Sequence, residues 1–157
     1  MVDAEEACVV AGGDEDVVGA DGTALAAIPS DRVADIRLAV HPSLRVVRSQ
    51  FPALTIWRMN VDDGVPEPVD LESGWEDALV LRSVVEVEVR SMPPGGAEFV
   101  TALANGQTAT EATRSAMGAS ARFDLSANFA ALIGAGAFVG YSLVDDEIRR
   151  EITEGRT

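Results

Sequence analysis

Residues 77–106, DALVLRSVVEVEVRSMPPGGAEFVTALANG, contain the pattern that decides the fold. In the first half, apolar residues recur at every second position between charged ones, which is the period of a strand with one dry face. This pattern predicts two short antiparallel strands, around residues 79–82 and 85–90. The Pro-Pro-Gly-Gly run ends the second strand, and residues 99–103 then show helical spacing. A hairpin followed by a helix is therefore the expected centre of the fold.

The segments that precede this centre predict further strands and a short helix. Apolar residues alternate along 36–40, and the strand resumes along 44–48 after an interruption at His41-Pro42-Ser43, because proline cannot donate to a strand ladder. A short helix is also expected near Arg32. Pro52 suits the first position of a helix, so residues 52–59 are expected to be helical and residues 60–68 to form a loop.

The segments that follow the centre predict two more helices and a last strand. Thr108 and Glu111 have the spacing of a capping box, and Asp124 is placed to cap an apolar helix that ends near Gly134. Residues 138–143 can extend again as a strand. The expected fold class is α+β: a small antiparallel sheet with three short helices. This is the layout of winged-helix domains and also of winged-helix-like peptide-recognition modules, which include recognition elements for ribosomally made peptides.

Length and charge limit the classes of function. The chain has 157 residues, enough for one domain, with a net charge of -14 and with Arg as its sole basic residue type apart from one His. Such acidity disfavours nucleic acid and membrane surfaces as partners. We expect an acidic stub over 1–23, one domain over 24–144 and a polar tail over 145–157. With no secretion signal or long apolar run in view, cytoplasm is the default location.

Few residues offer catalytic or metal-binding chemistry. His41 is the single histidine and Cys8 the single cysteine, so a catalytic triad or a zinc site has too few partners, and no catalytic residue or metal ligand is assigned. His41 is expected to be hydrogen-bonded at a strand end. Trp57 and Trp75 are expected to be core residues rather than binding aromatics.

Three arginines on extended segments allow two readings. Arg37, Arg45 and Arg48 could face an acidic partner, or they could simply blunt the edge of a sheet.

The chain resembles a known family along about 24–143. The matching stretches are HPSLRVVRSQFPALTIWRMN, EPVDLESGWEDALVLR, VEVEVR, AEFVTALANG and FDLSANFAALIGAGAFVGYSL. They are similar to the carboxy-terminal domain of the HvfC/BufC group, often described as DNA-binding proteins and encoded beside multinuclear non-haem iron oxidative enzymes that modify ribosomally made peptides. The methanobactin partner protein is a more distant relative. Members usually carry a helical amino-terminal domain, where this chain has the acidic segment 1–21.

The resemblance implies a role as a non-catalytic partner. Such a protein docks on the iron enzyme as a heteromer and helps to present the precursor peptide, whose leader is held as an added strand. The iron belongs to the other subunit, and this chain needs no cofactor of its own. The expected peptide-binding residues are Val85, Glu86, Val87, Glu88, Val89 and Arg90, and the expected docking residues are Arg37, Arg45, Arg48, Trp57 and Asn60.

The alternative is a winged-helix DNA-binding transcriptional regulator. It requires a basic recognition helix, and residues 108–117 offer only Arg114 beside Glu111.

Overall fold

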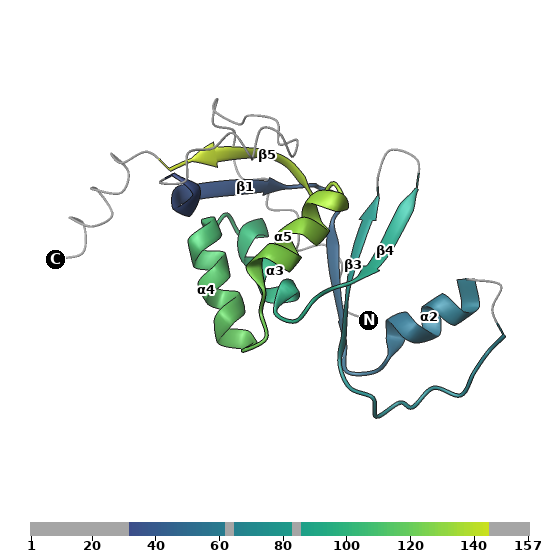
Figure 1. Ribbon diagram of the computed structural model, residues 1–157. Helices are drawn as coiled ribbons and strands as arrows, with labels where there is room; N and C mark the ends of the chain where they lie inside the picture. The colour runs from purple at the N-terminus through teal and green to yellow at the C-terminus, as the bar shows by residue number, and fades with distance from the viewer. Residues whose placement is uncertain (1–31, 62–64, 83–85, 145–157) are drawn as a thin grey trace.

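The computed structural model describes residues 32–61, 65–82 and 86–144, and Figure 1 shows their arrangement. In chain order the elements are η1 (Val33–Asp35), β1 (Ile36–Val40), β2 (Arg45–Ser49), α2 (Ala53–Val61), β3 (Glu76–Arg82), β4 (Val87–Ser91), α3 (Gly96–Ala104), α4 (Ala109–Ala119), α5 (Leu125–Gly134) and β5 (Phe138–Leu143). The class is α+β, as expected. The expected single sheet with three helices is wrong, because the described residues form two antiparallel sheets and four α-helices.

The two sheets are joined at a corner of the chain. β1 pairs with β5 in one sheet, and β2, β3 and β4 form the other in that order. Residues 41–44 turn between β1 and β2, with the amide of Leu44 bonded to the carbonyl of His41 at 2.9 Å. The Ser43 side chain satisfies the backbone of Arg82 at the end of β3, as a paired strand residue would. Its Oγ accepts from the amide of Arg82 at 3.0 Å and donates to the Arg82 carbonyl at 2.9 Å. The strand interruption that Pro42 predicted is therefore the point where the chain passes from one sheet to the other.

The hydrophobic core lies between the helices and both sheets. Phe99 at its centre is fully buried, and its ring lies 5.5 Å from that of Phe123 and 5.7 Å from that of Phe129. Phe129 in turn lies 5.8 Å from Phe138 of β5. Leu79 and Leu81 bring β3 into the same core. The amphipathic pattern that predicted β3 and α3 therefore describes their buried faces.

The helix ends follow the local signals in the sequence. Thr108 and Glu111 form the predicted capping box at α4, and the carboxylate of Asp124 accepts from the amide of Ala127 at the start of α5. Gly95 has a φ of 76°, a left-handed conformation that glycine adopts without strain. A methyl group added at Gly96 would lie 2.5 Å from Oδ1 of buried Asn128. The Gly-Gly pair thus allows α3 to lie close to α5.

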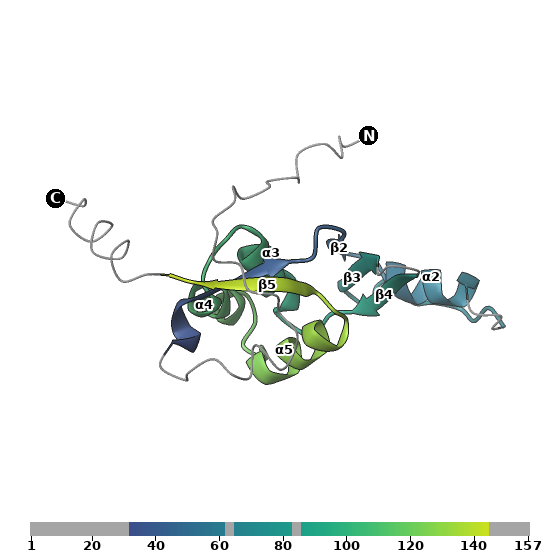
Figure 2. The same cartoon turned by 90° about the horizontal axis from the view of Figure 1, so that it is seen from above.

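One part of the molecule projects from this core. Figures 1 and 2 both show α2 at the far end of the molecule from α4 and β1. Within α2, Leu54 is the one buried residue. We call α2 and residues 65–75 the arm. We call β1, β5, α3, α4 and α5, together with the face of the β2–β3–β4 sheet that packs against them, the body.

Candidate interaction surface

The outer edge of β4 is open to a further strand. β4 is the last strand of its sheet, and within the described residues no hydrogen bond joins the outward backbone groups of β4 to another element. The amide of Met92 bonds to the carbonyl of Asp77, which sets the alternation of the β3–β4 ladder. By that alternation Glu88 and Arg90 bond to β3, while the backbone groups of Val87, Val89 and Ser91 point outward. On its side-chain face β4 lies near α5, because Nη1 of Arg90 is 4.0 Å from the position that a Cβ at Gly134 would take.

The two faces of β4 differ in character. Side chains alternate across a sheet, so Glu88 and Arg90 share the face of buried Leu81 and Leu79, their partners in register. They form an ion pair of 2.7 Å at the rim of this face. Val87 lies on the opposite face with 61% of its surface exposed. A peptide beside β4 would therefore meet a charged pair on one side and an apolar row on the other.

The structure thus places most of the expected peptide-binding residues on one open edge. Val87, Glu88, Val89 and Arg90 belong to β4, and Glu86 directly precedes it. Val85 lies outside the described residues, as does the hairpin turn.

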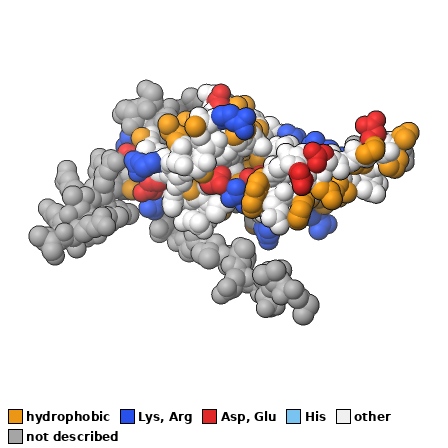
Figure 3. All heavy atoms as spheres, turned by 90° about the horizontal axis from the view of Figure 1, so that it is seen from below, with side chains coloured by type: hydrophobic (Ala, Val, Ile, Leu, Met, Phe, Trp, Pro, Cys, Tyr) orange, Lys and Arg blue, Asp and Glu red, His pale blue; other side chains and the backbone are white. Residues whose placement is uncertain are grey.

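A second exposed surface covers the arm. The prediction that Trp57 and Trp75 are core residues is wrong, because they are 43% and 73% exposed. The reason is that α2 packs mainly on β3, and this contact buries only Leu54 in the first turn of the helix. Orange side chains are prominent at this end in Figure 3. The other large exposed apolar residues of the arm and its junction with β2 are Phe51, Ile56, Val61, Val65 and Leu71.

Sequence reasoning did not find this apolar surface. Apolar residues in a short helix normally signal burial, and Leu54, Trp57 and Val61 even have the i, i+3, i+7 spacing of a single apolar stripe. No local feature shows that the main packing partner of α2 is the single strand β3.

Glu76 attaches the arm to the sheet. Its carboxylate accepts from both the amide, at 3.0 Å, and the hydroxyl of Thr55 at the start of α2. Burial pushes the pKa of Glu76 up, but the hydrogen bonds from Thr55 and the Leu54 amide outweigh it, so that the pKa is lower than usual. The carboxylate is therefore ionised at neutral pH and fixes the first turn of α2.

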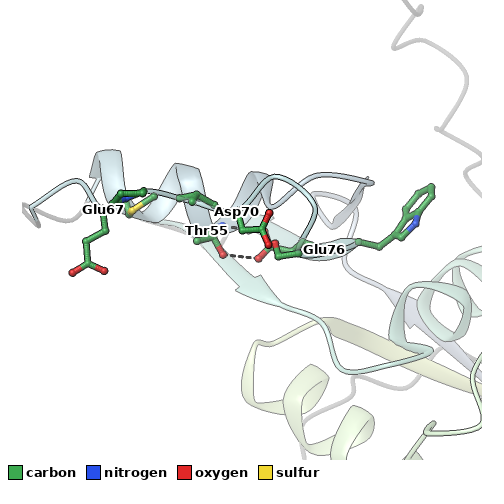
Figure 4. A pocket seen from close by; sticks show the side chains of 9 residues that line it. Thr55, Glu67, Asp70 and Glu76 are labelled. Carbon is green, nitrogen blue, oxygen red and sulfur yellow. Dashed lines mark hydrogen bonds between the residues drawn. The ribbon is translucent and has the colours of Figure 1, made fainter.

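A pocket of about 530 Å³ lies between α2 and the segment that precedes β3. Figure 4 shows Thr55, Asp70 and Glu76 close together, with the carboxylate of Glu67 pointing away from them. The pocket thus has an acidic wall, and Asp70 also accepts from the amide of Glu72 at 2.9 Å. Its lining residues are Thr55, Met59, Glu67, Pro68, Val69, Asp70, Ser73, Trp75 and Glu76.

The five expected docking residues do not share one face. Arg37 belongs to β1 in the other sheet, and Arg45 and Arg48 lie on opposite faces of β2 because they are three positions apart. Arg48 is already paired, at 3.1 Å to Asp77 and 2.8 Å to Glu98, which raises its pKa.

The remaining docking candidates occupy the arm. Trp57 and Asn60 are both on α2, and the side-chain Nδ2 of Asn60 donates to the Ile56 carbonyl at 2.7 Å. Trp57 is therefore the docking candidate with the largest exposed apolar surface.

His41 has the structural role expected for it. Its Nδ1 lies 3.1 Å from the amide of Ser43 and 2.9 Å from its Oγ, so the ring stabilises the corner between the sheets. Across the described ranges, no group of three or more His, Cys, Asp or Glu residues is placed to hold a metal ion. In the same ranges no helix is long and apolar enough to cross a membrane.

The charge of the described residues is far lower than that of the whole chain. They contain nine Arg against eleven Asp and Glu, a net charge of -2, whereas the whole chain carries -14. The acidity that disfavours anionic partners is therefore concentrated outside the described ranges. α4 carries Arg114 as its one basic residue, which is a weak basis for reading a DNA groove.

Comparison with known proteins finds no matching family model, no matching curated protein and no matching solved structure. The function is therefore proposed from the sequence resemblance together with the surfaces described above.

Proposed function

We propose that this protein is a cytoplasmic, non-catalytic partner of a multinuclear non-haem iron oxidase, and that it binds and presents a ribosomally made precursor peptide. The observation that carries the proposal is the open edge of β4, where Val87, Val89 and Ser91 direct their backbone groups outward. An extended leader segment can add there as a fourth strand, with backbone bonds supplying affinity and the two faces supplying selectivity.

The finer fold proposal is a winged-helix-like peptide-recognition domain. The β3–β4 hairpin followed directly by α3, α4 and α5 supports it, because this order places the open strand beside a helical layer. The corner at residues 41–44 and the inserted α2 are the features in which this chain differs from the simple layout.

Docking on the oxidase is assigned to the arm. Trp57 is half-exposed on a helix whose outer face has no partner among the described residues, and exposed aromatic side chains are common anchors of protein interfaces. Arg45 lies on the adjacent strand, although its guanidinium donates to the carbonyls of Pro42 and Leu44 at 2.8 Å.

The test of peptide binding is Val89→Pro. The amide of Val89 points outward, so proline removes one bond to an added strand and leaves the β3–β4 ladder intact. We expect the full chain to keep its far-UV circular dichroism and to lose at least tenfold in affinity for the precursor peptide encoded beside its gene. The control is Val139→Ala, an exposed change on β5, rather than a proline within a helix such as Thr101→Pro, which would break α3. Unchanged binding by Val89→Pro contradicts strand addition.

The test of docking is co-elution with the iron oxidase from the same gene neighbourhood on size exclusion at moderate salt. Trp57→Ala combined with Arg45→Glu should abolish co-elution, while Arg122→Glu, an exposed arginine beyond α4, should not. If the unaltered chain elutes alone and the oxidase modifies its peptide equally well without it, the partner function is wrong, and a DNA-binding screen becomes the next experiment.

A further inference from the structure

The charge pattern of β4 is complementary to itself. Glu88 and Arg90 are placed symmetrically about Val89, one position away on either side. We propose that two copies of this chain associate through β4 in an antiparallel ladder, with Val89 on the twofold axis and Glu88 of each copy opposite Arg90 of the other. The two three-stranded sheets then become one of six strands.

The backbone geometry permits this ladder. New hydrogen-bonded pairs can form only between residues whose backbone groups point outward, which are Val87, Val89 and Ser91. With Val89 facing its own copy, Val87 faces Ser91 of the second copy, so all three outward residues take part.

The same register brings the charges together. Glu88 and Arg90 then lie directly opposite one another in non-hydrogen-bonded pairs, where the side chains of facing residues are closest. Each already lies at the surface, with side-chain exposures of 39% and 45%, in an ion pair within its own strand. Exchanging the two pairs within the copies for two pairs between them loses no charge partner.

The neighbouring registers are disfavoured. A shift of two residues in one direction places Glu88 opposite Glu88 of the second copy, and a shift in the other direction places Arg90 opposite Arg90. Like charges directly opposite destabilise an antiparallel pair. The shift that places Glu88 opposite Glu88 also places Arg90 opposite Glu86 of the second copy, so it gains two attractive pairs beside the repulsive one. The register centred on Val89 has two attractive pairs and no repulsive one, so the charges favour it, whereas an edge protected by a run of one sign would repel every copy.

Two further features favour association. Val87, 61% exposed in the single chain, becomes a diagonal neighbour of Val89 of the second copy on the apolar face. The near balance of charge across the described residues leaves little repulsion between the two sheets themselves. This proposal does not depend on the proposed function, but it uses the same edge, so peptide and second copy exclude each other.

The experiment is sedimentation of the full chain at moderate salt over a range of concentrations. Glu88→Arg and Arg90→Glu each place like charges in both facing pairs, so each alone should weaken the dimer by about tenfold or more. The double variant Glu88→Arg with Arg90→Glu should dimerise again. A mixture of the two single variants should form the heterodimer, because their charges complement one another.

Three results would overturn the proposal: a wild-type chain that stays monomeric at a few hundred micromolar, a dimer that the single variants do not weaken, or a mixture that fails to restore it. Circular dichroism of each variant checks that the chain is folded. Peptide affinity is measured separately on the unaltered chain, at a concentration well below that at which it dimerises. An absence of peptide binding there counts against the proposed function and leaves the dimer untouched.

Discussion

The body and the arm use the same kinds of residue in opposite ways. In the body, aromatic rings pack against each other around Phe99, which has no exposed surface. In the arm, Trp57 is half-exposed and Trp75 is mostly exposed, and α2 packs mainly on the single strand β3. A surface that keeps its apolar side chains exposed without packing them is suited to binding another molecule. The comparison teaches that the packed aromatic core is confined to the body, whereas the arm keeps large apolar side chains exposed.

The largest expected effect separates the two regions directly. Phe99→Ala leaves a cavity at the centre of the body and should lower the free energy of unfolding by about 3–5 kcal/mol. Trp57→Ala removes an even larger side chain from the arm but should cost less than about 1 kcal/mol. Urea unfolding followed by far-UV circular dichroism measures both. Equal losses would mean that the arm is part of the cooperative core.

The next effect tests the close packing of α3 on α5. Gly96→Ala forces a methyl group against Oδ1 of Asn128 and should destabilise the protein by about 1–3 kcal/mol. Gly118→Ala is the matched control, because nothing lies within 4 Å of its added methyl group and alanine is the better helix former. It should stabilise the chain by about 0.5–1 kcal/mol. A neutral Gly96→Ala in thermal unfolding would show that α5 can move aside.

A smaller effect is confined to the arm and depends on pH. The pKa of Glu76 is lowered in the folded chain, so its stabilisation of α2 is complete above the ordinary pKa of glutamate and is lost as the pH falls through the lowered value. Both tryptophans of the chain lie in the arm, so their fluorescence reports on it. Their emission should change in acid at a pH below about 4.

Glu76→Gln supplies the comparison for that titration. It should loosen α2 at neutral pH by about 1 kcal/mol, because a neutral amide accepts more weakly from Thr55. It should also remove the acid transition in the tryptophan emission. An identical titration curve for Glu76→Gln would assign the transition to another carboxyl group.

The smallest effect concerns the contact between the second sheet and the body. Arg48 pairs with Asp77 of β3 and Glu98 of α3 while half of its own side chain remains exposed. Arg48→Ala should therefore cost less than about 1 kcal/mol, and the loss should shrink at high salt. Thermal unfolding at low and high salt measures it. A large, salt-independent loss would show instead that the aliphatic stem of Arg48 matters more than its charge.

Much of the local structure could be predicted from the sequence. Alternation predicted β3 and β4, helical spacing predicted α3, and cap residues predicted the starts of α4 and α5 at Thr108 and Asp124. These features depend on neighbours within a few residues along the chain, so a single sequence contains the information. The expectation that β4 binds a peptide came instead from the family resemblance, and the edge position on which it depends is a matter of strand order.

Only the tertiary structure decided which surfaces remain free. Whether an apolar residue such as Trp57 is buried depends on what packs against its helix, and that partner is chosen by contacts far apart in the chain. Arg37 and Arg45 lie in two different sheets because β1 pairs with β5, about a hundred residues further along the chain. No local sequence pattern predicts this pairing. By itself the sequence determined the elements and the charge pattern of β4, whereas long-range packing decided that β4 is an edge and that the arm is exposed.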